Sequence, residues 1–326
     1  MCRAVSFSAT IFLLHLSTGC AGTYRIDTHA PMVTSSARIG FVTNRAVKTR
    51  GRSSFFTDKP GAFSEGHCYL TRDSDRYQLD GIVAGQLSET DMSPHYRPRI
   101  LYTHGYAEGL KRACRRAARL RQLLPDTAAL LLASWPANSN PLTYHSDRKD
   151  LERSAAFFDL AIRKVLEATE AKDVVLVSHS LGSLALIKAV SRLDSTSLGD
   201  RKLRQLVLIA PDIAVTTFMQ YLPVLQDRIE EIVVYTSRKD RALQASARYH
   251  GSQRLGRIID ASIPDGLTIV EAGDTTINDW TGHNYHVKSD AVGEDLSATL
   301  GKKVQSRQFE RVRIEGHVWR LVRRAN

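Results

Sequence analysis

Short apolar runs alternate with amphipathic stretches through the middle of the chain. Runs of β-branched and other apolar residues without polar alternation are typical of strands buried on both faces, as in parallel sheets. Right-handed crossovers arrange such strands and helices into a doubly wound, mostly parallel sheet of the α/β class. The pattern predicts helices at 109–124, 150–171 and 181–193, and strands at 100–103, 129–135, 174–177, 206–210, 232–236 and 267–270.

Residues 22–98 carry weaker signals. Residues 37–43 read as a strand, whereas 49–63 are rich in Gly, Ser, Lys and Pro and read as a loop. One further helix fits between the strands that end at Ala210 and begin near Glu231. It can be a flap or a plain packing helix, and the pattern favours packing.

The C-terminal tail, residues 301–326, is basic and alternates apolar and polar positions around Glu315-Gly316. This alternation predicts a short β-hairpin with one apolar face, docked on the main domain through Trp319, with its basic side in solvent or on anionic lipid. A disordered basic tail is the alternative, because chain ends are often untethered.

The first twenty residues resemble a secretory leader, since Arg3 precedes an apolar stretch and small residues follow at 17–21. Cys20 sits where a bacterial lipobox has its lipidated cysteine, although Ser17 replaces the preferred leucine. We therefore expect export to the cell envelope, with membrane anchoring through Cys20. Cleavage after Ala21, which gives a soluble periplasmic protein, and an uncleaved cytosolic N-terminus are the alternatives.

Composition adds few constraints. The formal charge is +11, and the basic residues are scattered along the chain except at 111–121 and in the tail. Because the sequence has no nucleic-acid-binding motif, we interpret this charge as a solvated basic face and predict no nucleic-acid partner.

The spacing of the cysteines indicates no zinc site. Whether Cys68 pairs with Cys114 stays open. Cys114 falls on the apolar face of a predicted helix, which is typical of a buried cysteine.

The clearest chemical signal is a serine at a strand-to-helix turn. Residues 174–177 form a buried strand, and Ser178-His179-Ser180-Leu181-Gly182 leads directly into a helix. Such a nucleophile elbow lifts a serine hydroxyl above the sheet edge and aims the helix N-terminus at a reacting carbonyl. We therefore predict Ser180 as a nucleophile. The usual first glycine of this motif is Ser178 here.

Two backbone amides are predicted to form an oxyanion hole. A His-Gly turn, His104-Gly105-Tyr106, follows the first strand of the main domain. In this architecture that turn supplies one N–H and the residue after the nucleophile supplies the other. The predicted donors are the amides of Tyr106 and Leu181, with His104 ordering the loop.

An acid and a histidine must follow the serine in the chain. Asp240 comes just after the 232–236 strand, and His283 lies in the next polar loop. Because active groups collect at the carboxyl edge of an open α/β sheet, these two complete the predicted triad. Asp212 is the alternative acid, and His286 competes with His283.

With these motifs, the chain resembles the bacterial α/β-hydrolase family known as domain of unknown function 900. The resemblance spans roughly residues 37–290 and rests on His104-Gly105-Tyr106, Ser134-Trp135-Pro136, His179-Ser180-Leu181-Gly182, the segments around Asp240 and His283, and Thr43-Asn44-Arg45. Ala107 replaces the family's usual asparagine. The resemblance implies an α/β-hydrolase fold and the same triad, without naming a substrate.

The predicted organisation is a leader at 1–20, an N-terminal extension at 21–98, a catalytic domain at 99–300 and the tail at 301–326. The predicted activity is hydrolysis of a small-molecule or lipid ester, or of a thioester or amide, through an acyl-enzyme that needs no metal or cofactor. The alternative is an envelope-anchored binding or scaffolding protein with little activity. The sequence predicts no particular oligomeric state.

Overall fold

The structure is a computed structural model that describes residues 22–32, 36–74, 76–88, 91, 95–193, 198–199, 201–259, 266–273 and 280–324. The predicted leader, with Cys20, lies outside these ranges. Within them, no helix is both long and apolar enough to cross a bilayer.

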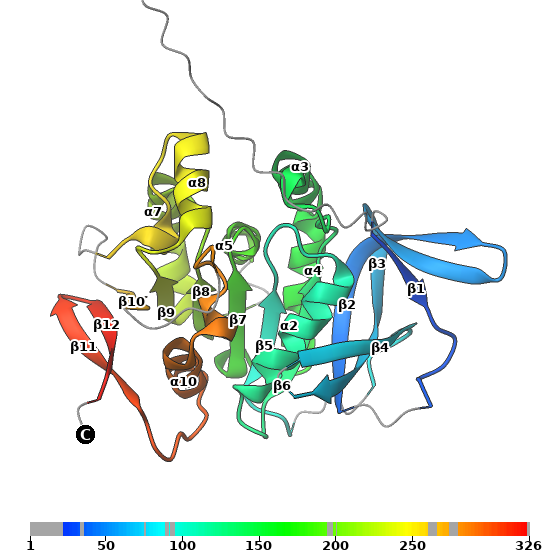
Figure 1. Cartoon of the computed structure of the whole chain (residues 1–326), viewed down its shortest axis with the longest axis horizontal. Helices are drawn as coiled ribbons and strands as arrows, with labels where there is room; N and C mark the ends of the chain where they lie inside the picture. Colours follow the sequence, from blue (N-terminus) through cyan, green and yellow to red (C-terminus); the bar gives the residue numbers. More distant parts are fainter. Residues whose placement is uncertain are drawn as a thin grey trace, which may run out of the picture.

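One sheet of twelve strands runs through the described part of the chain (Figure 1). Its strand order is β1-β3-β2-β6-β5-β7-β8-β9-β10-β12-β11, and β4 lies off this path and pairs with β3. The bounds in chain order are β1 (Thr23–Ile26), β2 (Ala37–Arg50), β3 (Ser53–Asp73), β4 (Arg76–Ala84), β5 (Arg99–Thr103), β6 (Ala129–Ser134), β7 (Val174–His179), β8 (Leu203–Ile209), β9 (Ile229–Thr236), β10 (Thr268–Glu271), β11 (Phe309–Glu315) and β12 (Val318–Arg323).

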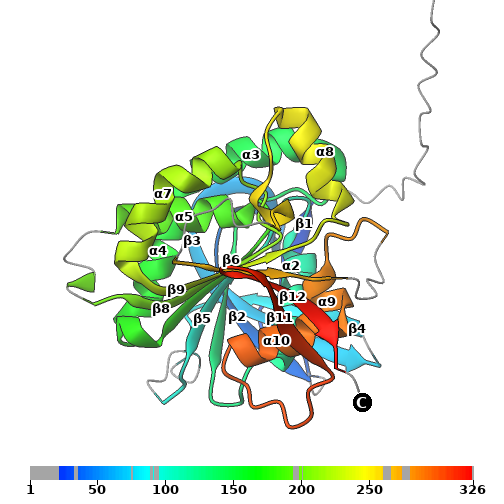
Figure 2. The ribbon, with the colours of Figure 1, turned by 90° about the vertical axis from the view of Figure 1, so that its left-hand side faces the viewer.

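Helices cover both faces of this sheet (Figure 2). The strands from β6 across to β10 pair in parallel, as the apolar pattern predicts. The helices are α2 (Leu110–Gln122), α3 (Tyr144–Arg153), α4 (Ala155–Glu167), α5 (Gly182–Arg192), α7 (Val215–Arg228), α8 (Arg241–His250), α9 (Tyr285–Lys288) and α10 (Asp290–Thr299); the short 3₁₀ turns are η1 (Pro141–Thr143), η2 (Ala171–Asp173) and η3 (Leu255–Arg257).

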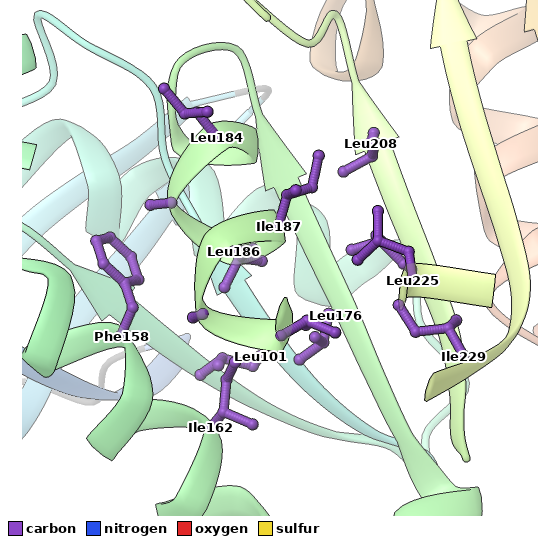
Figure 3. Packing of buried hydrophobic residues seen from close by; sticks show 14 of the residues in the cluster. Leu101, Phe158, Ile162, Leu176, Leu184, Leu186, Ile187, Leu208, Leu225 and Ile229 are labelled. Atoms are coloured by element: carbon purple, nitrogen blue, oxygen red, sulfur yellow. The ribbon is translucent and has the colours of Figure 1, made fainter. Parts of the chain in front are cut away.

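Alternate residues of the central strands face two separate cores. Leu101, Leu176 and Leu208 join the core beneath α4, α5 and α7. Their neighbours, such as Tyr102 and Val177, join the core beneath α2, α9 and α10. Figure 3 shows the first core, where side chains of α5 lie among those of the sheet and of α4. Burial on both faces explains why these strands have no polar alternation.

Two predicted elements differ in the structure. Residues 49–63 are not a loop, because β3 begins at Ser53 and only a tight turn at Gly51-Arg52 separates it from β2. Pro60 cannot donate to a ladder, and it sits opposite Arg45 where the register shifts. The helix predicted over 150–171 is two helices divided at Ser154, whose hydroxyl donates to the carbonyl of Asp150.

The predicted N-terminal extension is part of the main sheet. β2 pairs in parallel with β6, from Gly40 opposite Leu131 to Thr43 opposite Ser134. A disulfide joins Cys68 of β3 to Cys114 of α2. α7, the helix predicted between Ala210 and Glu231, buries Phe218, Leu222 and Leu225, so it packs on the sheet.

The C-terminal hairpin is present, but Trp319 is not its buried anchor. β12 pairs in parallel with β10, which makes the hairpin the edge of the main sheet. A strand that continues a sheet contacts both of its faces, so Val318 enters one core and Leu321 the other. Trp319 is half-buried beneath the guanidinium of Arg313, 4.7 Å from its ring centre.

The basic side of the hairpin is not all in solvent either. Arg311 donates to both carboxylate oxygens of Asp295, at 2.8 and 3.1 Å from Nε. Arg320 donates to Glu271 at 2.6 Å. Two of the arginines expected to face solvent or lipid are therefore committed to the main domain.

Candidate active site

Ser180 stands at the apex of the turn between β7 and α5. Its φ of +54° is in the left-handed region, which costs a non-glycine residue on the order of 1–3 kcal/mol. The turn is held by hydrogen bonds from the Ser180 amide to the carbonyl of Ile209 (2.9 Å) and from the Asp212 amide to the carbonyl of Ser180 (3.2 Å). Ile209 is the last residue of β8, and Asp212 follows it by three residues. The carboxyl end of β8 therefore fixes the strained conformation of Ser180.

Small residues are required around this turn because two loops meet there. A Cβ on Gly105 would lie 2.9 Å from the Cβ of Ser180, and a Cβ on Gly182 would overlap the carbonyl oxygen of His104. Ser178, which replaces the usual glycine, fits because its hydroxyl donates to the Ser183 hydroxyl at 2.9 Å. This departure from the motif therefore leaves no unsatisfied group.

Asp240 and His283 are brought together at the carboxyl edge of the sheet. Nδ1 of His283 lies 2.7 Å from Oδ2 of Asp240. The other oxygen of Asp240 accepts the Leu243 amide at 2.9 Å and so caps α8. Burial alone would lower the pKa of His283, but the charge and hydrogen bond of Asp240 outweigh it, so the net pKa is raised above the usual value.

Asp212 has other partners. Its Oδ1 accepts from Ser246 at 2.6 Å and lies 3.3 Å from Nε of Arg254, and its Oδ2 accepts from Tyr144 at 2.9 Å. The carboxylate therefore joins α3 to α8, and the imidazole of His283 is held by Asp240.

Three imidazoles lie in contact in a row that leads away from the site, with their rings tilted by 48° and 38° to one another. The ring centre of His179 lies 4.7 Å from that of His283 and 4.5 Å from that of His286. Nε2 of His179 lies 3.2 Å from the carbonyl oxygen of His283. Burial, foremost, lowers the pKa of both His179 and His286 well below the usual value, so both are neutral near pH 7.

The turn expected to supply an oxyanion hole packs against Ser180. Among the described residues, neither the Tyr106 amide nor the Leu181 amide donates to a backbone carbonyl. The buried carboxylate of Asp147 holds the turn by accepting the Ala107 amide at 2.9 Å. Ala107 has a φ of +56°, a second strained residue beside the nucleophile.

His104 and Trp135 hold the same His-Gly turn in place through contacts with each other. Their rings are stacked 5.5 Å apart, and the Trp135 indole N–H donates to the carbonyl of His104 at 2.9 Å. Burial, followed by the charge of Arg45, lowers the pKa of His104 to about 3. An imidazole that is stacked and neutral near pH 7 orders the loop and transfers no proton there.

Arg45 joins the N-terminal strands to this turn. Its guanidinium is fully buried, pairs with Asp58 and donates to the carbonyls of Trp135 (2.6 Å) and Glu108 (3.2 Å). Desolvation lowers its pKa, and the charge of Asp58 opposes this effect. A charge buried this deeply is tolerated only with such partners.

A pocket of about 280 Å³ is lined by both Ser180 and His283. Its walls come from the 104–108 turn, from η1 with the start of α3, and from α8. Leu142 and Tyr249 on its rim are largely exposed. The lining combines aromatic and aliphatic side chains with a few polar groups, as is usual for small-molecule sites: Tyr106, Leu142, Tyr144, His145, Ser180, Asp212, Ala242, Leu243, Ala245, Ser246, Tyr249 and His283.

Sequence reasoning did not identify Asp147, Arg45 or Tyr144 as parts of the site. Asp147 lies in a polar stretch with no sign of burial, and the partners of Arg45 are 13 to 92 residues away. The one available signal was the Thr43-Asn44-Arg45 motif of the family resemblance. Across the described ranges, no group of three or more His, Cys, Asp or Glu side chains is arranged to hold a metal ion.

Comparison with solved structures finds distant esterases among the similar chains. An esterase from the archaeon Pyrobaculum calidifontis has 10% identity and a TM-score of 0.40, covering 82% of this chain and 86% of its own. The carboxylesterase EstE1 from a metagenomic library has 13% identity and a TM-score of 0.35, covering 74% of this chain and 84% of its own. A Bacillus subtilis gene product has 16% identity and a TM-score of 0.34, covering 62% of this chain and 97% of its own.

A search of curated proteins finds no match. The model of the family described as "Alpha/beta hydrolase of unknown function (DUF900)" matches residues 88–299. This span contains the elbow, the His-Gly turn, Asp240 and His283, and it covers more than half of the chain. The chain therefore belongs to this α/β-hydrolase family of unknown function and has its fold.

Proposed function

We propose that the protein is a serine hydrolase that cleaves an ester, or a thioester or amide, through an acyl-enzyme. One observation carries the proposal: Ser180, strained at the apex of its turn, lines the same pocket as His283, whose Nδ1 is held by Asp240. This arrangement matches the roles of nucleophile, base and orienting acid on an α/β-hydrolase sheet.

In the proposed reaction, Oγ of Ser180 attacks the substrate carbonyl while Nε2 of His283 takes its proton. The imidazolium then gives this proton to the leaving alcohol, thiol or amine, and a water deprotonated by His283 releases the acid. Oγ of Ser180 is buried without a hydrogen-bond partner among the described residues. Catalytic hydrogen bonds often tighten only once substrate is bound.

Charge that develops on the carbonyl oxygen would be stabilised by the amides of Tyr106 and Leu181. Their turns are held in place by Asp147 and by the close contact of Gly105 with Ser180. Donors fixed before the reaction need no reorganisation during it, and removing one such donor costs roughly 10²–10³ in kcat in serine hydrolases.

The pocket favours a small apolar acyl or aryl group. Its volume of about 280 Å³ is small for a ligand site, and its lining includes three tyrosines and several aliphatic side chains. The exposed rim residues Leu142 and Tyr249 offer apolar surface to a longer chain or a lipid ester. Anchoring through Cys20 and location in the envelope remain predictions.

Hydrolysis of a chromogenic ester tests the proposal. We expect the wild-type chain to cleave p-nitrophenyl acetate or butyrate and Ser180→Ala to lose on the order of 10⁴ or more in kcat. Ser191→Ala is the matched control, because Ser191 lies at the far end of α5 and donates to the Lys188 carbonyl. Near-native turnover by Ser180→Ala would refute the mechanism.

A further inference from the structure

The basic run of α2 gathers on one face of the helix. Arg112, Arg115, Arg116 and Arg119 follow the i, i+3, i+4, i+7 spacing, so they form a stripe opposite the buried face of α2. The sequence suggests that this stripe is simply a solvated face. In the structure, however, it forms the wall of a cleft.

Two adjoining hollows, of about 510 and 850 Å³, lie along this stripe and share Arg119, Val287 and Lys288 as lining residues. α2, α9, α10 and β4 gather on this side of the sheet (Figure 2). The hollows share no lining residue with the pocket at Ser180. We call the pair the basic cleft; its remaining cations are Arg72, Arg76, Lys302 and Lys303.

Positive charge dominates the basic cleft. Its described lining has nine lysines and arginines and three carboxylates, Asp73, Asp290 and Glu294. Glu294 is already committed, because its oxygens accept the Gln308 amide at 2.9 Å and the Phe309 amide at 3.1 Å. A cleft lined by one sign of charge focuses the field and concentrates the opposite ion.

Several of these cations have no ion-pair partner among the described residues: Arg76, Arg115, Lys288 and Lys303. Others are engaged, since Arg116 pairs with Glu108 and Arg112 donates to the Ala107 carbonyl at 2.7 Å. The unpaired ones come from β4, α2, α9 and the segment after α10, so a ligand in the cleft would meet positive charge from four segments of the chain.

Each of the two hollows has a buried nitrogen without a hydrogen-bond partner: His286 lines the larger hollow and Arg115 the smaller. His286 lines the cleft, is only 2% exposed, and neither of its ring nitrogens has a hydrogen-bond partner in the described structure. Nε of Arg115 is likewise buried without an acceptor. Buried polar groups are rarely left unsatisfied, so each such group needs an explanation. An oxyanion in each hollow would accept a hydrogen bond from the N–H there, one ring N–H of His286 or Nε–H of Arg115.

We propose that the basic cleft binds a ligand carrying two or more phosphoryl groups, with Arg115 and His286 as its buried donors. The planar guanidinium of Arg115 matches phosphate oxygens two at a time, while lysines such as Lys288 act as point charges. The free ligand and the headgroup of an anionic phospholipid share this chemistry. The concave shape favours a ligand that enters the cleft over one that lies flat across its rim.

The row of three imidazoles connects this cleft to the proposed catalytic base. The ring of His286, at the cleft, contacts that of His179, which in turn contacts that of His283. Burial, foremost, lowers the pKa of His286, and the charges of Arg116, His283 and Arg119 lower it further. An anion in the cleft would offset the arginine charges that face these rings.

Titration calorimetry of the full chain with sodium tripolyphosphate tests the proposal without any measurement of hydrolysis. We expect saturable binding that weakens about tenfold or more in Arg115→Gln/Lys288→Gln. Lys48→Gln/Arg50→Gln is the matched control, because it removes two exposed charges from the far end of β2. No saturable binding, or equal weakening in both variants, would overturn the proposal.

Two further experiments test the role of His286 and identify the source of the phosphoryl groups. His286→Phe, which keeps an aromatic ring against His179, should weaken tripolyphosphate binding while the melting temperature stays within a few degrees; unchanged affinity would overturn the role of His286. Vesicles of phosphatidylglycerol that bind the chain and release it on addition of tripolyphosphate would identify a lipid headgroup. Tripolyphosphate binding without vesicle binding would identify a soluble ligand.

Discussion

Asp240 serves two partners with its two carboxylate oxygens: Oδ2 lies 2.7 Å from Nδ1 of His283, and Oδ1 accepts the Leu243 amide at the start of α8. The residue that orients the imidazole therefore also fixes the helix that forms one wall of the pocket. A substitution at Asp240 must keep the cap if it is to report on chemistry alone.

Asp240→Asn meets this requirement, because asparagine caps helices as well as aspartate does. It should lower kcat by about 10⁴, since the amide holds the imidazole in the wrong tautomer. Steady-state ester hydrolysis measures the loss. Asp212→Asn is the control and should cost much less, because Asp212 contacts Tyr144, Ser246 and Arg254. The reverse ranking would move the acid to Asp212.

The pH profile should have an acid limb set by His283. The base must be neutral to accept the proton of Ser180, so kcat/KM should rise as pH increases through the pKa of His283. Because Asp240 raises this pKa, the midpoint should lie above the usual histidine value of about 6.5. In Asp240→Asn the midpoint should move to lower pH. A midpoint well below 6.5 in the wild type would contradict this electrostatic account.

Arg45 should be essential for stability although it touches no reacting atom. Arg45→Met leaves the nearly buried Asp58 without its cation and removes donors from the carbonyls of Trp135 and Glu108. Breaking a buried pair in this way costs about 3–5 kcal/mol. Urea unfolding measures it, with the exposed Arg50→Met as the control. Equal midpoints for the two variants would contradict the proposed structural role of Arg45.

The C-terminal hairpin should stabilise the whole domain. Truncation after Leu300 removes the burial of Val318 and Leu321, roughly 3–6 kcal/mol in total, and leaves β10 as an open edge. Thermal unfolding should show a clearly lower Tm than for a chain truncated after Arg324. An unchanged Tm would mean that the hairpin does not dock in solution.

Features encoded by adjacent residues were predictable from the sequence. The turn at Ser180 is one, because a buried strand, a serine between small residues and a helix follow each other directly. The central strands are another, since their apolar runs reflect burial on both faces. Local patterns of this kind depend little on the rest of the chain.

Features that depend on distant partners were not predictable. Asp212 and Asp240 both follow a strand, and only the positions of Arg254 and His283 distinguish them. The spacing of the arginines in α2 is the same for a helix face in water as for one that lines a cleft, so the sequence could not distinguish the two. Trp319 is the largest apolar residue of its hairpin, yet pairing with β10 buries Val318 and Leu321 instead.

Labelling with a fluorophosphonate, followed by mass spectrometry of the digested protein, tests the central claim most directly. Such probes react only with an activated serine. We expect one modified peptide, containing Ser180, with labelling abolished in Ser180→Ala, retained in Ser191→Ala and strongly slowed in Asp240→Asn. Labelling at another serine, or a folded wild-type protein that takes up no label, would contradict the account and favour a binding protein on a hydrolase fold.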